Sequence, residues 1–317
     1  MLEKHLQPPV RLVTTRLPSP TADIPPLLGA AWPGRRRGLR TRAGGVLLGA
    51  LLLAPLPVDA QGGAMDTVPR STRPLLTRAD AITLGAFTLA TLAITPADRR
   101  LAERLQNPRT QENRVIRRSA AVVRELAAPG SLVIGGTLYA VGRLGGNERM
   151  ASLGLHGTEA VVLGLGIVSL GKVMAGRARP YVTADTNARD FKWMRGLRGG
   201  RDYHSFPSGH TVMAFAAAAA VTGETARWWP RATPYIGTAL YGGAALAGVS
   251  RMYNNQHWAS DVLVGAAIGT VVGQKVVRYH RTHPDNRVDR WFLAASVVPA
   301  PSGGGRVVRL GLVPRRD

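Results

Sequence analysis

The sequence contains no cysteine, which excludes disulfide bonds and thiolate chemistry but leaves the redox compartment undecided. Aromatic residues make up only 6 % of the 317 residues, and 19 acidic residues stand against 41 lysines and arginines, giving a net charge of +22. A basic chain can bind nucleic acid, anionic lipid or an acidic substrate. Zinc-finger spacing, an aromatic RNA-binding signature and a convincing recognition helix are all missing, so nucleic acid is not expected as a partner.

The body of the chain also lacks a fixed repeat and, before residue 290, an alternating strand pattern. Instead it carries six apolar runs, mostly of 11–17 residues, at 81–94, 132–144, 158–174, 211–221, 235–249 and 262–277. The arginine-rich segment 99–126 lies between the first two runs, and Asn107-Pro108 predicts a break within it. We predict an all-α fold, a helical bundle of about six core helices. Two valine-rich runs around a glycine turn suggest a β-hairpin at the C-terminus.

The N-terminal region has the composition of an export signal. Residues 1–34 are rich in proline and indicate a disordered segment or a start placed too far upstream. Arginines at 35–42 precede an apolar run at 46–58 and an A-x-A-like exit, which is typical of a signal peptide. An uncleaved membrane anchor and a twin-arginine signal are the alternatives. We divide the chain into the N-terminal segment and signal (1–60), N-terminal helices (61–150), a catalytic core (151–280) and a tail or hairpin (281–317).

Three short blocks between residues 170 and 261 concentrate the chemistry of the sequence. The first reads K-x6-R-P, the second P-S-G-H and the third S-R-x5-H-x3-D. Their candidate functional residues are Lys172, Arg179, Ser208, Gly209, His210, Arg251, His257 and Asp261. Three cations, two histidines, one carboxylate and a Ser-Gly turn suit an enzyme that holds an oxyanion and attacks it with a histidine.

The spacing within the first two blocks suggests where the side chains lie. Lys172 and Arg179 are seven residues apart, so on one helix they would share a face. Snorkelling at a helix end is the alternative for this pair. Ser208 is placed as the N-cap of a helix whose free amides favour an anion, and His210 would sit in its first turn. A plain capped helix with a surface histidine is the alternative for this block.

The third block pairs an imidazole with a carboxylate. His257 and Asp261 are four residues apart, so on a helix they would be neighbours, and the carboxylate would orient the ring and raise its basicity. A surface pair worth roughly a few tenths of a kcal/mol is the alternative. Metal ligation by His210, His257 and Asp261 is a further reading, which we discount because the three nearby cations would repel a metal ion and attract an oxyanion.

In this order and with these spacings, the blocks resemble the signature of the type 2 phosphatidic acid phosphatase superfamily, which includes bacterial acid phosphatases and vanadium haloperoxidases. The resemblance covers about residues 152–277. It implies that His257 attacks phosphorus and becomes a phosphohistidine, that Asp261 orients it, and that His210 protonates the leaving oxygen. It further implies hydrolysis without a metal or other cofactor, with the phosphate held by Lys172, Arg179, Arg251, Ser208 and the Gly209 amide.

The expected function is therefore a metal-independent phosphatase for phosphomonoesters or lipid (di)phosphates, acting on a phosphorylated small molecule or a lipid. A vanadate-dependent haloperoxidase on the same scaffold and a non-catalytic phosphate- or lipid-binding protein are the alternatives. Segment 181–205 joins two blocks and is expected to select the substrate, which the sequence does not identify. Oligomeric state is not indicated either.

The predicted export signal and the length of the apolar runs together indicate where the protein is located. Export would put the site outside the cytoplasm. The apolar runs are shorter than the span of about 20 residues that a bilayer requires. An integral topology with an outward-facing site would also place basic loops outside, against the charge rule. These points favour a periplasmic bundle, either soluble or peripheral at a membrane surface, over the alternative of an integral inner-membrane protein.

Overall fold

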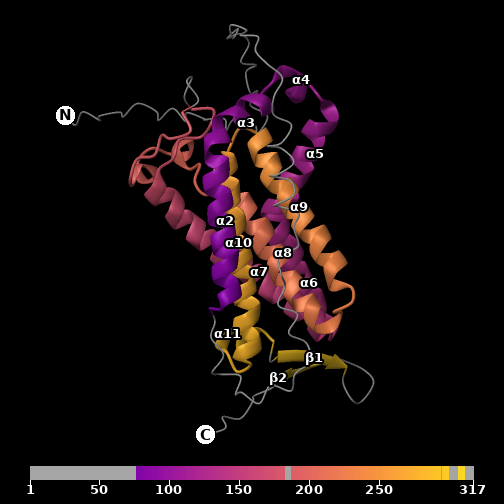
Figure 1. The fold of residues 1–317 in the computed structure, drawn as a ribbon. Coiled ribbons are helices and arrows are strands. Elements are labelled where there is room, and N and C mark those ends of the chain that lie inside the picture. The colour runs from indigo at the N-terminus through magenta and orange to yellow at the C-terminus, as the bar shows by residue number, and fades with distance from the viewer. Residues whose placement is uncertain (1–75, 183–186, 294, 300–305, 311–317) are drawn as a thin grey trace, which may run out of the picture. The chain divides into compact units, whose positions relative to one another are not determined.

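The computed structural model describes residues 76–182, 187–293, 295–299 and 306–310. The expectations for residues 1–60, including the export signal, lie outside these ranges. Helices dominate the described part, and the all-α prediction is confirmed (Figure 1). They are α2 (Arg78–Ile94), α3 (Asp98–Leu105), α4 (Pro108–Gln111), α5 (Arg114–Glu125), α6 (Ser131–Leu144), α7 (Glu148–Ala175), α8 (Gly209–Trp228), α9 (Thr233–Tyr253), α10 (Ala259–Thr282) and α11 (Arg287–Phe292).

Each of the six apolar runs forms one long helix: α2, α6, α7, α8, α9 and α10. The helices exceed their runs because polar residues at both ends continue the same backbone hydrogen bonding. Asn147 caps α7 through its side chain, so that the helix begins at Glu148, ten residues before the predicted start, and reaches 28 residues. The predicted break at Asn107-Pro108 is present, since Asn107 caps α4 with Pro108 at its first position.

Shorter elements complete the described chain. Single turns lie at η2 (Thr95–Ala97), η3 (Leu126–Gly130), η4 (Arg195–Leu197) and η5 (Arg201–Tyr203). Strands β1 (Ala295–Pro299) and β2 (Arg306–Leu310) pair antiparallel, with Ala295 opposite Leu310. This pairing is the predicted C-terminal hairpin.

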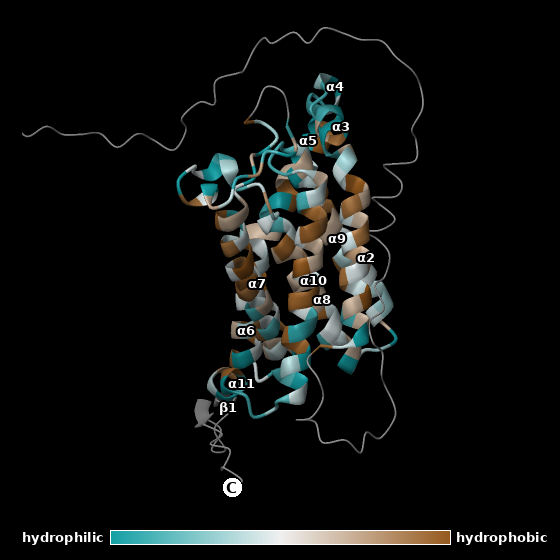
Figure 2. Ribbon diagram, turned by 60° about the vertical axis from the view of Figure 1, so that its left-hand side comes forward, coloured by the Kyte–Doolittle hydropathy of each residue, from teal (hydrophilic) through white to brown (hydrophobic). Residues whose placement is uncertain are grey.

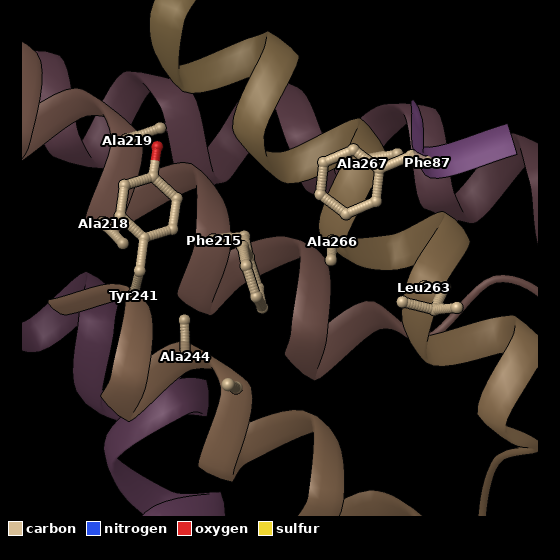
Figure 3. Packing of buried hydrophobic residues seen from close by; sticks show 10 residues of the cluster. Phe87, Phe215, Ala218, Ala219, Tyr241, Ala244, Leu263, Ala266 and Ala267 are labelled. Carbon is tan, nitrogen blue, oxygen red and sulfur yellow. The ribbon is translucent and has the colours of Figure 1, made fainter. Parts of the chain in front are cut away.

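Helix α8 lies at the centre of the bundle, packed against α7, α9 and α10. Phe215 of α8 contacts the ring of Tyr241 edge-on, and the surrounding core is built largely of alanine (Figure 3). Phe87 brings α2 into the same cluster. Small side chains let the helix axes approach closely, so the residues at the helix ends are held in fixed relative positions.

Three glycines spaced four residues apart give α10 a smooth face against α8. They are Gly265, Gly269 and Gly273. A Cβ atom at Gly269 would lie 2.5 Å from the carbonyl oxygen of Val212, which no real side chain tolerates. The close helix contact therefore requires glycine, and it sets the distance between the second and third sequence blocks.

Four helical stretches are long and apolar enough to cross a membrane by length and composition: Arg78–Leu105, Arg114–Leu144, Glu148–Ala175 and Ala259–Thr282. Figure 2 shows apolar residues along the middle of the helices and polar residues toward α3, α4 and α11. Large apolar side chains point away from the protein, for example Leu89 at 70 % and Leu170 at 66 % exposure. Exposed apolar surface on this scale is typical of contact with lipid.

These helices favour the integral inner-membrane alternative over the soluble or peripheral bundle that run length suggested. The prediction from run length counted only the uninterrupted apolar residues. A span can include glycine, threonine and terminal polar residues, because the helix satisfies its own backbone groups in lipid. Helix length therefore decides the question better than run length.

Candidate active site

The first block does not lie on a single helix face. Helix α7 ends at Ala175, and Gly176 adopts a left-handed conformation with φ of +48°. A Cβ atom at Gly176 would overlap the carbonyl oxygen of Lys192, so this turn requires glycine. Lys172 thus belongs to the last turn of α7, whereas Arg179 lies in the following loop. The predicted shared helix face is wrong, although both cations reach the same site.

Lys172 lies against the second block. A Cβ atom on Gly209 would come within 3.4 Å of the Lys172 Nζ atom. The ammonium group also interacts electrostatically with Arg179, Arg251 and Asp261. The first and third blocks therefore meet at the N-terminus of α8, where the helix dipole favours an anion.

Ser208 occupies the N-cap position of α8, but its side chain makes no capping bond. Its Oγ atom lies 2.8 Å from the Oγ1 atom of Thr211, and its amide donates to the carbonyl oxygen of Asp261 over 3.2 Å. The predicted cap is thus correct in position and wrong in bonding. The free first-turn amides of α8 stay available to a ligand.

His210 lies in the first turn of α8 and is half-buried. Its imidazole interacts electrostatically with Arg251, His257 and Lys172. Both histidines of the sequence blocks therefore belong to one cation-rich site. A bound anion would counter the positive charge around His210 and favour its protonated form.

His257 lies just before α10, not on it, and only 3 % of its surface is exposed. Its Nδ1 atom is 2.5 Å from the main-chain carbonyl oxygen of Ser205 and 3.8 Å from the nearest carboxylate oxygen of Asp261. A carbonyl oxygen can only accept, so Nδ1 carries the proton and Nε2 keeps a lone pair in the neutral ring. Burial lowers the pKa of His257 to about 4, although Asp261 opposes this shift.

Asp261 is fully buried and joins several chain segments. One of its oxygens accepts from the Ser205 hydroxyl at 2.6 Å and from the Trp258 amide at 2.9 Å. The other forms an ion pair with Arg177. Ser205 therefore contacts His257 through its carbonyl and Asp261 through its hydroxyl, and it connects the two residues that sequence spacing paired directly.

Arg177 was missed by sequence reasoning, although it lies inside the first block. It is 2 % exposed and also donates to Asp98 of α3 at 2.8 Å and to the Ser260 hydroxyl at 2.8 Å. The rings of Phe191 and Trp258 lie within cation–π distance of its guanidinium group. The one hint in the sequence was the position of this arginine between Lys172 and Arg179. Its partner Asp98 is 79 residues away and carries no motif.

Two guanidinium groups of the site have unsatisfied donors. Arg179 bonds the side chain of Gln256, the residue before His257, yet its Nε atom is buried without a partner. Arg251 is 7 % exposed, and its Nε atom is likewise buried without a partner. Buried donors are almost always paired, so these two suit an oxyanion that accepts from both.

The family model of the PAP2 superfamily matches residues 155–285, which contain all three blocks. This match confirms the resemblance drawn from the blocks.

Two proteins to which this chain is similar carry phosphatase names. Over 109 residues the chain is 39 % identical to a lipid A 1-phosphatase of Porphyromonas gingivalis, a match that covers 34 % of this chain and 20 % of that protein. The chain thus matches about one fifth of the length of this curated relative. The crystal structure of a transmembrane PAP2 type phosphatidylglycerolphosphate phosphatase from Bacillus subtilis is 19 % identical, with a TM-score of 0.42, covering 66 % of this chain and 98 % of that one.

Proposed function

We propose that this protein is an integral membrane phosphatase that removes phosphate from a lipid. The observation that carries the proposal is the arrangement around His257. A buried imidazole with a free Nε2 lone pair shares a site with Lys172, Arg179 and Arg251. The PAP2 family match and the lipid A 1-phosphatase relative support phosphoryl transfer from a lipid.

In the proposed reaction, Nε2 of His257 attacks phosphorus and the bond between phosphorus and the lipid oxygen breaks. His210 gives its proton to the departing oxygen. Water then attacks the phosphohistidine while His210 takes one of its protons, and the phosphorus–nitrogen bond breaks to release phosphate. The cations stabilise negative charge on the transferring group, which is the main contribution to such reactions. Ser205 and Asp261 keep the ring oriented.

A lipid substrate fits the surroundings of the site. Loop residues next to it expose large apolar side chains, including Trp193 at 72 % and Leu197 at 61 %. Phe191 of the same loop is 47 % exposed and packs on Arg177. These side chains would meet acyl chains or the bilayer interface while the phosphate enters the cationic site. We propose that this loop selects the substrate and that the site faces the periplasm.

The test measures phosphate release from phosphatidic acid in mixed micelles by the full-length protein in detergent. We expect turnover that persists in chelator when initial rates are expressed per folded, monodisperse molecule. The His257→Ala variant should lose roughly 10⁴-fold or more in kcat, because the nucleophile is gone. His283→Ala, a histidine outside the site, is the matched control.

Several results would contradict the proposal. Turnover by His257→Ala at a wild-type rate would exclude its role as nucleophile. Phosphate or vanadate binding without any turnover would indicate a binding protein instead. Loss of the initial rate in chelator, with the fold retained, would reject metal-independent hydrolysis.

A further inference from the structure

A second cluster of ionisable side chains lies at the opposite end of the helices that carry the candidate active site. It joins His156 of α7, Glu224 of α8, His280 of α10 and Asp289 of α11. Glu224 follows His210 by fourteen residues on α8, so at 1.5 Å per residue the two lie roughly 21 Å apart. None of the three sequence blocks reaches this cluster, and the proposed hydrolysis makes no use of it.

Three potential ligand atoms converge in the cluster. The Oδ1 atom of Asp289 lies 3.2 Å from Nε2 of His156 and 2.8 Å from Nδ1 of His280. The two imidazole rings stack with their centroids 3.9 Å apart. Both histidine side chains are almost completely buried, at 6 % and 2 % exposure. The geometry therefore directs two buried ring nitrogens at one oxygen of the partly buried Asp289 carboxylate.

The other nitrogen of each ring faces a carboxylate. His156 Nδ1 lies 2.9 Å from Glu224, and His280 Nε2 lies 2.7 Å from Glu159. An ionised carboxylate only accepts, so each ring carries its proton on this outer nitrogen. In a neutral ring the inner nitrogen then presents a lone pair to Asp289. Three acceptors pointing at one another repel unless protons or a metal cation lie between them.

One other donor reaches this part of the cluster. Asn286 Nδ2 lies 3.2 Å from Nδ1 of His280 and 2.7 Å from the second carboxylate oxygen of Asp289. These contacts of Asn286 do not involve His156, and the shorter one orients the Asp289 carboxylate. Protonating both rings instead would place two positive charges in stacked rings that are faced by the carboxylates of Glu159, Glu224 and Asp289. A single divalent cation removes this conflict because it accepts all three lone pairs.

The two distances from the Asp289 oxygen, 3.2 and 2.8 Å, suit a metal ion, and all three ligand atoms lie within 4.8 Å of one another. Zinc binds histidine nitrogen and carboxylate oxygen at about 2.0–2.2 Å, so a tetrahedral ion holds its ligand atoms roughly 3.3 Å apart. A carboxylate on the outer nitrogen of each ligating histidine is the usual arrangement around such ions. Glu224 also has one buried oxygen without a hydrogen-bond partner. Its nearby cation is Arg281, which interacts with it electrostatically.

We propose that His156 Nε2, His280 Nδ1 and Asp289 Oδ1 bind one divalent transition-metal ion of the zinc class, and that Glu224 and Glu159 orient the two imidazoles. The ion ties α11 to α7 and α10, with α8 attached through Glu224. Its role is structural, because it is far from the site of hydrolysis. The ion should therefore raise the thermal stability of the protein and leave the initial rate of phosphate release unchanged.

The first experiment needs no variant. Tag-free full-length protein in detergent is stripped with chelator, reloaded with Zn²⁺ or Co²⁺, desalted and analysed by elemental mass spectrometry. We expect about one ion per chain, a Co²⁺ absorption spectrum of nitrogen and oxygen ligands in a low-coordinate site, and a higher Tm after reloading. Failure to retain stoichiometric metal, with an unchanged Tm, would overturn the proposal and leave a proton-bridged network only.

The second experiment assigns the ligands. Asp289→Asn keeps the shape of the side chain and removes the anionic ligand, and Asp285→Asn on the preceding exposed turn is its matched control. We expect Asp289→Asn to lose the retained metal and the Tm response, while the control keeps both. Glu224→Gln should weaken metal affinity by about 10–100-fold as an outer-shell change. Equal metal content in Asp289→Asn and wild type would overturn the assignment even if phosphatase activity is normal.

Discussion

His257 and Ser205 are joined by a hydrogen bond of 2.5 Å between the ring Nδ1 atom and the main-chain carbonyl oxygen. This bond sets the tautomer of the histidine through the backbone. Asp261, whose nearest oxygen is 3.8 Å from the same ring atom, acts mainly on Ser205, Trp258 and Arg177. The carboxylate thus supports the loop that orients the imidazole.

The pH dependence of the reaction should reflect the buried state of His257. Burial lowers its pKa to about 4, and attack requires the neutral ring. We expect kcat/KM to fall as pH drops through about 4, because a proton then occupies Nε2, and not near the ordinary value of about 6.5. The measurement is a pH–rate profile with the substrate's own ionisation, near pH 6, determined separately. An additional acid limb at about 6.5 that belongs to the enzyme would contradict this prediction.

Replacing Arg177 should unfold the site. Arg177→Gln leaves Asp98 and Asp261 as buried carboxylates without their shared cation. Breaking a buried ion pair in this way costs about 3–5 kcal/mol. We expect a fall of that order in the free energy of unfolding in detergent, together with loss of phosphate release. Arg198→Gln, an exposed arginine in the same loop, should be neutral, and equal stability of both variants would argue against the assigned role.

Arg251 should act through the geometry of its guanidinium group as well as its charge. Arg251→Lys keeps the cation and removes the buried Nε donor that has no protein partner. If that donor binds the transferring phosphate, kcat should drop by about 10²–10³-fold. Arg231→Lys, an exposed arginine between α8 and α9, is the control. Wild-type kcat in Arg251→Lys would show that charge alone suffices.

The contact between α10 and α8 should tolerate no added atom. Gly269→Ala places a Cβ atom 2.5 Å from the Val212 carbonyl oxygen, so the helices must separate. We expect a destabilisation of about 1–3 kcal/mol and reduced turnover, since His210 lies on α8 and Asp261 on α10. Gly166→Ala on α7 meets nothing within 4 Å and should be neutral or stabilising. Similar thermal unfolding of the two variants would refute the close-contact argument.

Sequence reasoning anticipated the six long helices, because apolar runs bounded by turn residues report burial or lipid contact directly. It also gathered the eight motif residues, which the fold brings to one end of α8. It did not anticipate Arg177 or Ser205, whose partners lie 79 and 52 residues away. Such pairings depend on how helices cross, which local spacing does not encode. Segment length misled in the same way, since Asn147 and Gly176 set the ends of α7 beyond its apolar run.

The bond between Arg177 and Asp98 bears on how the protein can be cut down. Asp98 precedes the first residue of the PAP2 match at position 155. It holds Ser260 as well, through bonds of 2.9 and 2.5 Å. A fragment trimmed to the matched segment would lack Asp98, so Arg177 would keep only Asp261 of its two acidic partners. The boundary of the homology and the boundary of the cooperative unit are different, and truncations should begin upstream of α3.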